Sequence, residues 1–209
     1  MADLYRSFAE LVATQREGVA WSREYIPRES RILVMAPHGG WIEPMTCELA
    51  RLVAGEDFSF YAFRALGPAH EGDLHLTSHR FDEPLALRAA AEAEWVVAIH
   101  GEGTRDRPFA MIGGRWKGFR HEMTGALGRA RFPVEGPRPG LRGRNPRNIC
   151  NRGRRGGGGQ LEISEGLRRS LRQDRRSMER FVEVIRTVLL ELEAGPRPAS
   201  PRPWLSPPG

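Results

Sequence analysis

Lysine and cysteine are scarce in this chain of 209 residues. Lys117 is the only lysine, so the formal charge of +6 and the pI of about 10.3 come almost wholly from arginine. The two cysteines, Cys47 and Cys150, are too few for a disulfide framework, and no Cys-x-x-Cys pair suggests a cysteine zinc site. We expect both to be buried free thiols of a protein in a reducing compartment.

Long apolar runs are also absent, because no stretch approaches the roughly 20 residues that a membrane span needs. The first eight residues contain no basic segment followed by an apolar core, so no secretory signal is expected. The sequence therefore predicts a cytoplasmic protein that has no membrane partner. Its composition, with 40% hydrophobic and 28% charged residues, is that of an ordinary globular protein.

The pattern of apolar residues predicts a single α/β domain over residues 1–194. Helices are expected at residues 4–18, 42–53, 84–93, 116–130 and 172–193, and strands at 32–36, 58–63, 95–100 and 160–164. Strands that alternate with helices predict a mostly parallel or mixed sheet flanked by helices. Residues 133–159 are rich in glycine, proline and arginine and are expected to be mostly loop, and the proline-rich residues 195–209 are expected to form a disordered tail.

Two of the predicted strands end in a histidine that is followed by glycine. The strand at 32–36 leads into Pro-His-Gly-Gly, which contains His38, and Glu43 follows five residues later. The strand at 95–100 ends in His100. Because parallel strands bring their carboxyl ends to one edge of a sheet, we expect the two imidazoles to meet there. Together with a carboxylate they are typical zinc ligands, although a histidine in this position can also be a packing or capping residue.

Arginines crowd residues 138–155, which contain seven of them. A basic segment attracts polyanions of any kind, so one interpretation is an arginine-rich protein that binds nucleic acid. The segment contains no aromatic residues between the arginines, which disfavours stacking on single-stranded nucleic acid. Charge alone does not choose among acidic partners.

Several catalytic motifs are incomplete in this chain. The run Gly156–Gly159 lacks the Gly-Lys-Ser/Thr ending of a phosphate loop, and no Gly-x-Ser-x-Gly is present for a serine hydrolase. A second group of histidines has a spacing that fits no regular helix face as a metal site: His70, His75 and His79.

Blocks of residues from Tyr5 to Leu171 resemble the poly-γ-glutamate hydrolase family, which is sometimes described as phage-related replication proteins. These blocks are Tyr5–Phe8, Ala36–Pro44, Leu74–Ser78, Ile99–Gly101, Asn148–Gly153 and Gly159–Ser164. The resemblance implies a fold similar to zinc carboxypeptidases and the hydrolysis of the γ-amide bonds of poly-γ-glutamate with one zinc ion. Where Trp41 stands, the family usually has a small residue, so the indole is expected to narrow the site or to supply a stacking surface.

The resemblance also implies three zinc ligands and a general base: His38, Glu43, His100 and Glu162. The side chain of Glu162 is expected to point away from the core into a cleft, because strand side chains alternate and its two neighbours, Leu161 and Ile163, are apolar. Three protein ligands leave one position of a zinc ion open to water, whose pKa falls to about 7 on the metal. A nearby glutamate can take the proton from that water.

Four residues are expected to contact the substrate: Arg152, Asn151, His75 and Ser78. The Asn-Arg pair is chemically similar to the pair that holds the substrate carboxylate in carboxypeptidases, and the other two are expected to line the cleft. The expected partner is an acidic polymer or acidic amide, and zinc is the one cofactor implied. Two other functions compete with this one, the nucleic-acid-binding protein and a zinc amidase that acts on a different acidic amide.

Overall fold

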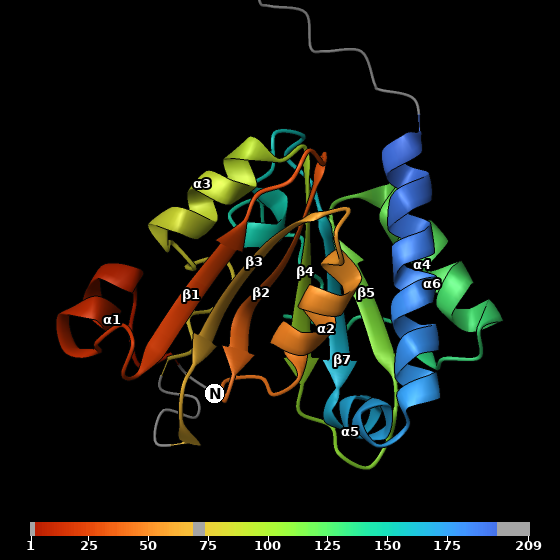
Figure 1. Ribbon diagram of the computed structural model, residues 1–209, viewed down its shortest axis with the longest axis horizontal. Helices are drawn as coiled ribbons and strands as arrows, with labels where there is room; N and C mark the ends of the chain where they lie inside the picture. Colours follow the sequence, from red (N-terminus) through yellow and green to blue (C-terminus); the bar gives the residue numbers. More distant parts are fainter. Residues whose placement is uncertain (1–2, 69–73, 196–209) are drawn as a thin grey trace, which may run out of the picture.

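A seven-stranded mixed sheet runs through the computed structural model, which describes residues 3–68 and 74–195 (Figure 1). Its strands lie in the order β1-β3-β2-β4-β7-β5-β6. The inner four, β3, β2, β4 and β7, are parallel, whereas β1 and β5 run antiparallel to their neighbours β3 and β7. The bounds are Trp21–Ile26 (β1), Ile32–Gly40 (β2), Ser59–Ala65 (β3), Trp95–Glu102 (β4), Ala110–Gly114 (β5), Val134–Glu135 (β6) and Gly159–Ser164 (β7).

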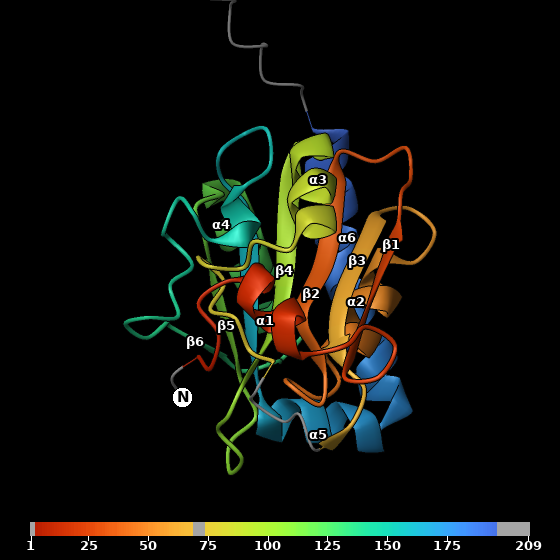
Figure 2. The ribbon, with the colours of Figure 1, turned by 90° about the vertical axis from the view of Figure 1, so that its left-hand side faces the viewer.

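Helices cover both faces of this sheet (Figures 1 and 2). One face packs against α2 (Thr46–Ala54), α4 (Lys117–Arg129), α5 (Glu165–Gln173) and α6 (Arg175–Ala194). The other packs against α1 (Phe8–Thr14), α3 (Pro84–Glu92) and the 3-10 turn η2 (Ile149–Asn151). The predicted single α/β domain with a mixed, mostly parallel sheet is confirmed. Within the described residues, no helix is long and apolar enough to cross a membrane.

The sequence patterns do not predict β1, β5 or α5. β1 is an edge strand with three polar residues in succession, Ser22 to Glu24, and β5 ends in two glycines. The helix predicted at 172–193 is α6, which begins only at Arg175, because the side chain of Asp174 accepts a hydrogen bond from the amide of Arg176 at 3.0 Å and caps it there. The tail expected at 195–209 lies, beyond Gly195, outside the described residues.

β2 continues to Gly40 instead of ending at Ala36. Its pairing with β3 shifts register between Ala36 and Gly39, and Pro37 falls within that irregularity, where its missing amide proton costs no ladder hydrogen bond. A Cβ on Gly39 would lie 1.8 Å from the sulfur of Cys47, and one on Gly40 would lie 2.1 Å from the carbonyl oxygen of Ala65. The two glycines therefore let α2 and β3 pack directly against the strand end that carries the first histidine.

The chain leaves β2 and β4 in opposite directions. β2 continues through α2 to β3 on one side, whereas the chain after β4 goes on to β5 and β7 on the other side. Two adjacent parallel strands with diverging connections leave a crevice at their carboxyl ends, which is where open α/β sheets bind ligands. His38 and His100 lie at these two strand ends.

Candidate active site

Three side chains converge at the carboxyl ends of β2 and β4. The Glu43 carboxylate places Oε1 3.1 Å from Nδ1 of His38 and Oε2 3.5 Å from Nδ1 of His100. The two Nδ1 atoms are 3.2 Å apart. Both histidines are almost fully buried, since only 1% of the surface of His38 and 2% of the surface of His100 is exposed to solvent. The structure thus brings together the three residues that the two strand-end patterns and the turn after β2 single out.

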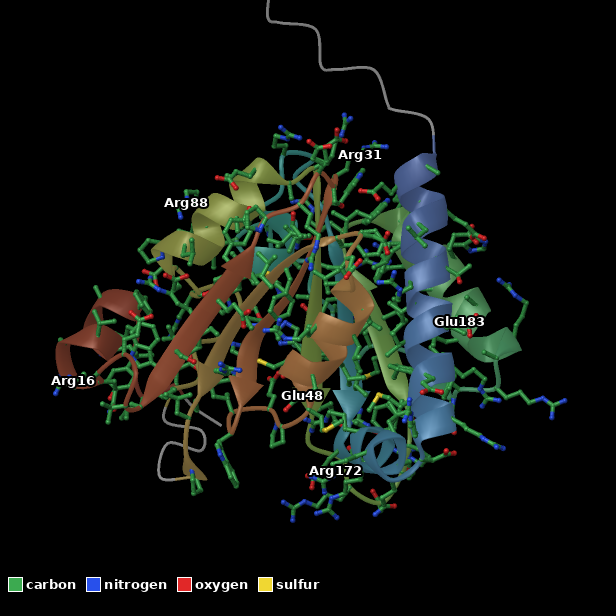
Figure 3. The ribbon with its side chains drawn as sticks, in the orientation of Figure 1. Arg16, Arg31, Glu48, Arg88, Arg172 and Glu183 are labelled. Carbon is green, nitrogen blue, oxygen red and sulfur yellow. The ribbon has the colours of Figure 1, made fainter. Side chains whose placement is uncertain are left out.

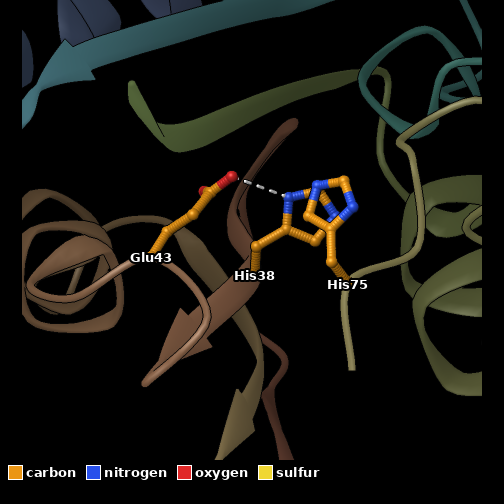
Figure 4. A group of neighbouring side chains, drawn as sticks. All are labelled: His38, Glu43 and His75. Atoms are coloured by element: carbon orange, nitrogen blue, oxygen red, sulfur yellow. Dashed lines mark hydrogen bonds and ion pairs between the residues drawn. The ribbon is translucent and has the colours of Figure 1, made fainter. Parts of the chain in front are cut away.

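Hydrogen bonds decide which nitrogen of His38 faces this cluster. Its Nε2 lies 2.8 Å from the carbonyl oxygen of Leu76, so Nε2 carries the proton of the neutral ring and Nδ1 carries the lone pair. That lone pair points at the carboxylate of Glu43 (Figure 4). Two acceptors that face each other repel unless a proton or a cation lies between them. Nitrogen and carboxylate donors at this spacing fit a zinc ion.

Glu43 is held in its ionised form. Burial favours the neutral carboxyl, but the charge of His38 and the hydrogen bonds with His100 and His38, which these rings give when they are protonated, outweigh burial and hold the pKa of Glu43 well below its usual range. The backbone amide of Gly101 also donates to Oε2 at 2.8 Å. A deprotonated carboxylate is the form that a metal ion binds.

His75 extends the cluster from the other side of His38 (Figure 4). The two ring centroids are 4.2 Å apart, and ligand atoms of His38, Glu43 and His75 lie within 4.8 Å of one another. Nδ1 of His75 bonds Oδ1 of Asp3 at 2.8 Å, which leaves the lone pair on Nε2. A carboxylate behind an imidazole is the usual support of a metal-binding histidine. His75, expected only to contact substrate, is therefore also a nitrogen donor at this site.

Glu162 lies across from His100 on the neighbouring strand. The register of β4 and β7 pairs these two residues, so their side chains leave the sheet on the same face, while Leu161 and Ile163 point into the core on the other. Burial raises the pKa of Glu162 to about 7, against the opposing charge of His100. A carboxyl group that titrates near neutral pH is matched to accepting and returning a proton.

A chain of amides fixes the position of the Glu162 carboxylate. Nε2 of Gln160 donates to Oε1 of Glu162 at 2.5 Å, and Oε1 of Gln160 accepts from Nδ2 of Asn148 at 3.1 Å. Neither amide is among the site residues predicted from the sequence. Gln160 carries a usable signal, because it stands two residues before Glu162 on the same strand and therefore on the same face. Asn148 arrives from a loop and carries no such signal.

One cavity of about 760 Å³ is lined by the three histidines, the two glutamates and the two amides described above: His38, His75, His100, Glu43, Glu162, Gln160 and Asn148. Ser78, expected to contact substrate, also lies there, with Oγ 3.4 Å from Nε2 of His100. Two arginines from the basic segment, Arg142 and Arg144, line its wall. The remaining lining includes Thr77, His79, Glu102, Leu141, Asn145 and several glycines.

The structure does not bring Asn151 or Arg152 to this cavity. Nδ2 of Asn151 donates to the carbonyl oxygens of Gly143 and Asn145 at 2.7 and 2.9 Å, and its Oδ1 accepts from the amide of Gly158 at 3.0 Å. Asn151 thus shapes the loop that carries the lining arginines, with its polar atoms already engaged. Arg152 is exposed and is not among the lining residues.

Trp41 also lies outside the catalytic cavity. It is 45% exposed and lines a separate cavity of about 530 Å³ together with Arg64, Arg168 and Arg172. The expected narrowing of the site by the indole is therefore wrong for the cavity that holds the histidines.

Comparisons with known proteins decide the family. Residues 5–187 match the model of the poly-gamma-glutamate hydrolase family. The chain belongs to this family. UPF0714 protein YndL of Bacillus subtilis (strain 168) is 34% identical to it over 177 residues, which are 81% of this chain and 67% of that protein.

Two solved structures are similar in fold to this chain. A bacteriophage poly-gamma-glutamate hydrolase superimposes with a TM-score of 0.85 and 28% identity over 91% of this chain and 98% of that one. A structure described as the zinc-free apo form of YndL gives a TM-score of 0.84 and 31% identity over 91% and 99% of the two chains. The protein is a hydrolase, as the sequence analysis predicts.

Proposed function

We propose that this hydrolase depends on zinc and cleaves the γ-glutamyl amide bonds of poly-γ-glutamate. The observation that carries the proposal is the convergence of His38, Glu43 and His100 in one cavity with Glu162 beside them. The zinc-free description of the apo YndL structure supports zinc as the metal, and the family supports the polymer as the substrate.

His38 and His100 would bind the zinc ion through Nδ1, and Glu43 would bind it through its carboxylate. His75 stands ready as a further donor, because its Nδ1 is engaged by Asp3. When bound, zinc polarises a scissile carbonyl and lowers the pKa of water to about 7. The pairs Leu76–His38 and Asp3–His75 hold the rings in the tautomers that this binding needs.

The remaining side chains of the cavity move a proton and hold the substrate. Glu162 takes a proton from the attacking water and delivers it to the leaving nitrogen, while Gln160 keeps its carboxylate in place. Every residue of a γ-linked glutamate polymer carries a free carboxylate. Arg142 and Arg144 can bind these carboxylates with paired hydrogen bonds and set the register of the chain in the cavity.

Hydrolysis of two polymers tests the proposal. The purified protein with zinc is expected to release amines from poly-γ-glutamate at least about 100-fold faster than from α-linked polyglutamate, because the γ-amide places the free carboxylate differently from the α-amide. A chelator is expected to abolish this activity, and added zinc to restore it. Full activity in excess chelator would contradict the zinc site. Equal cleavage of both polymers, or cleavage of small acidic amides alone, would contradict the substrate.

A further inference from the structure

A third cavity, of about 460 Å³, has a lining made almost entirely of cations. Its residues are Arg115, Lys117, Arg120, Arg144 and Pro146. The only lysine of the chain is thus one of them. No acidic residue belongs to the lining. We call this the basic cavity.

The basic cavity adjoins the catalytic cavity, because Arg144 lines both. The loop that carries Arg144 is held by its backbone. The amide of Gly114 donates to the carbonyl oxygen of Arg142 at 2.9 Å, and Asn151 bonds the carbonyl oxygens on either side of Arg144. Arg120 is anchored on the far side by a 2.7 Å hydrogen bond from Nη1 to the carbonyl oxygen of Gly114. A fixed cationic surface therefore continues out of the catalytic cavity.

In the described part of the chain the cations of the basic cavity have no acidic partner, unlike other arginines of the segment 138–155. Arg138 pairs with Glu102 at 3.0 Å, and Arg155 pairs with Glu94 at 3.0 Å. Across residues 3–68 and 74–195, no ion pair within 4.0 Å involves Arg115, Lys117 or Arg144. Burial, and then the charge of Arg144, lower the pKa of the Arg120 guanidinium. Uncompensated like charges held together are destabilising unless an anion joins them.

The surroundings favour a chain of carboxylates over a nucleic acid. Trp116, the aromatic residue next to Lys117, stacks on Trp95 with ring centroids 4.2 Å apart and also packs against Phe119, whose ring centroid is 5.8 Å away. The Trp116 ring is therefore already used in aromatic packing within the protein, which disfavours it as a stacking platform for a base. A polymer that already places one carboxylate on Arg144 in the catalytic cavity would bring the next ones to the basic cavity.

We propose that the basic cavity is a subsite for carboxylates of the acidic polymer that lie outside the catalytic cavity, on one side of the scissile bond. This inference rests on the proposed function. A long chain fills both cavities at once, and the second contact then forms within a single complex. A short γ-glutamyl peptide reaches only the catalytic cavity. The subsite therefore gives long chains an advantage over short ones.

The test compares a long and a short substrate in a charge-reversal variant, Arg115→Glu/Lys117→Glu. The ratio of kcat/KM for poly-γ-glutamate to kcat/KM for a γ-glutamyl tripeptide is expected to fall about tenfold or more, since two attractive contacts become repulsive. The matched control is Arg16→Glu/Arg88→Glu, which changes the net charge equally at exposed residues near α1 and on α3 (Figure 3). Its ratio is expected to stay within about twofold of the wild-type ratio.

A binding measurement separates this inference from the proposed function. Poly-γ-glutamate is titrated by calorimetry into Glu162→Gln protein, with and without the charge reversal, at one salt concentration. Weaker binding by the protein that carries the charge reversal than by Glu162→Gln alone supports the subsite even if neither substrate is cleaved. Equal binding, or an unchanged substrate ratio, overturns it. Tighter binding of a single-stranded oligonucleotide of equal charge, lost in the same variant, assigns the basic cavity to nucleic acid and also overturns it.

Discussion

Replacing Glu162 by glutamine is expected to lower kcat on poly-γ-glutamate by about 10²–10⁴-fold while the protein keeps its metal. Glutamine has nearly the same shape and fills the same buried space, but it cannot take a proton from water. The three proposed ligands, His38, Glu43 and His100, are unchanged by the substitution. The measurements are steady-state kinetics, the zinc content and the thermal midpoint of the variant.

The control for this substitution is Glu122→Gln. Glu122 is exposed on α4 and does not line the catalytic cavity, so its substitution is expected to leave kcat within about twofold of the wild-type value. If the Glu162→Gln protein kept more than a tenth of the wild-type activity, Glu162 would not be the proton acceptor.

Replacing Arg168 by alanine is expected to destabilise the protein by about 3 kcal/mol. Arg168 lies on α5 and is only 5% exposed. Its Nη1 donates to the carbonyl oxygen of Pro44 at 2.9 Å, and its Nη2 donates to that of Glu102 at 3.2 Å. These carbonyls follow Glu43 and His100 closely in the chain, so one guanidinium joins the two segments that carry these proposed zinc ligands.

The glycine at position 101 makes room for the Arg168 guanidinium that links the two segments. A Cβ on Gly101 would lie 2.1 Å from Nη1 of Arg168, so the glycine after His100 provides the space that the guanidinium occupies. Without Arg168, the carbonyls of Pro44 and Glu102 lose their donor and the two segments lose their link. We therefore expect weaker zinc binding in addition to the loss of stability.

Arg169→Ala is the matched control on the same helix. Arg169 is 56% exposed and pairs with Glu165 at 3.1 Å, and exposed pairs of this kind contribute about 0.2–1 kcal/mol. Unfolding in denaturant, followed with and without zinc, measures both variants. A free energy of unfolding for Arg168→Ala that matches that of Arg169→Ala would show that the buried guanidinium does not hold the site together.

The sheet is predictable from the sequence where strands are buried on both faces. β4 alternates between the two cores, with Val97 and Ile99 on one side and Val96 and Ala98 on the other, and so appears as an unbroken apolar run. β1 is an edge strand in which Ser22, Arg23 and Glu24 are consecutive, so its periodicity is lost. Its pairing with β3 defines it.

The candidate site is predictable to the extent that it follows strand order. His38 and His100 meet because β2 and β4 are adjacent and parallel, and the strand-end patterns contain that information. The support that Asp3 gives to His75 joins residues 72 positions apart and leaves no local trace. The lining arginines likewise could not be chosen from sequence, since Arg144 and Arg152 stand in similar loops and only the folded chain places Arg144 at the catalytic cavity.

Zinc analysis of the purified protein by mass spectrometry tests the metal site most directly. About one zinc ion per chain is expected in the wild type and in His121→Ala, in which an exposed histidine of α4 is removed. His38→Ala is expected to lose most of that zinc, because it removes the nitrogen that faces both Glu43 and His100. Wild-type protein that takes up no zinc, or His38→Ala protein that retains as much as the wild type, would contradict a zinc ion bound by these three residues.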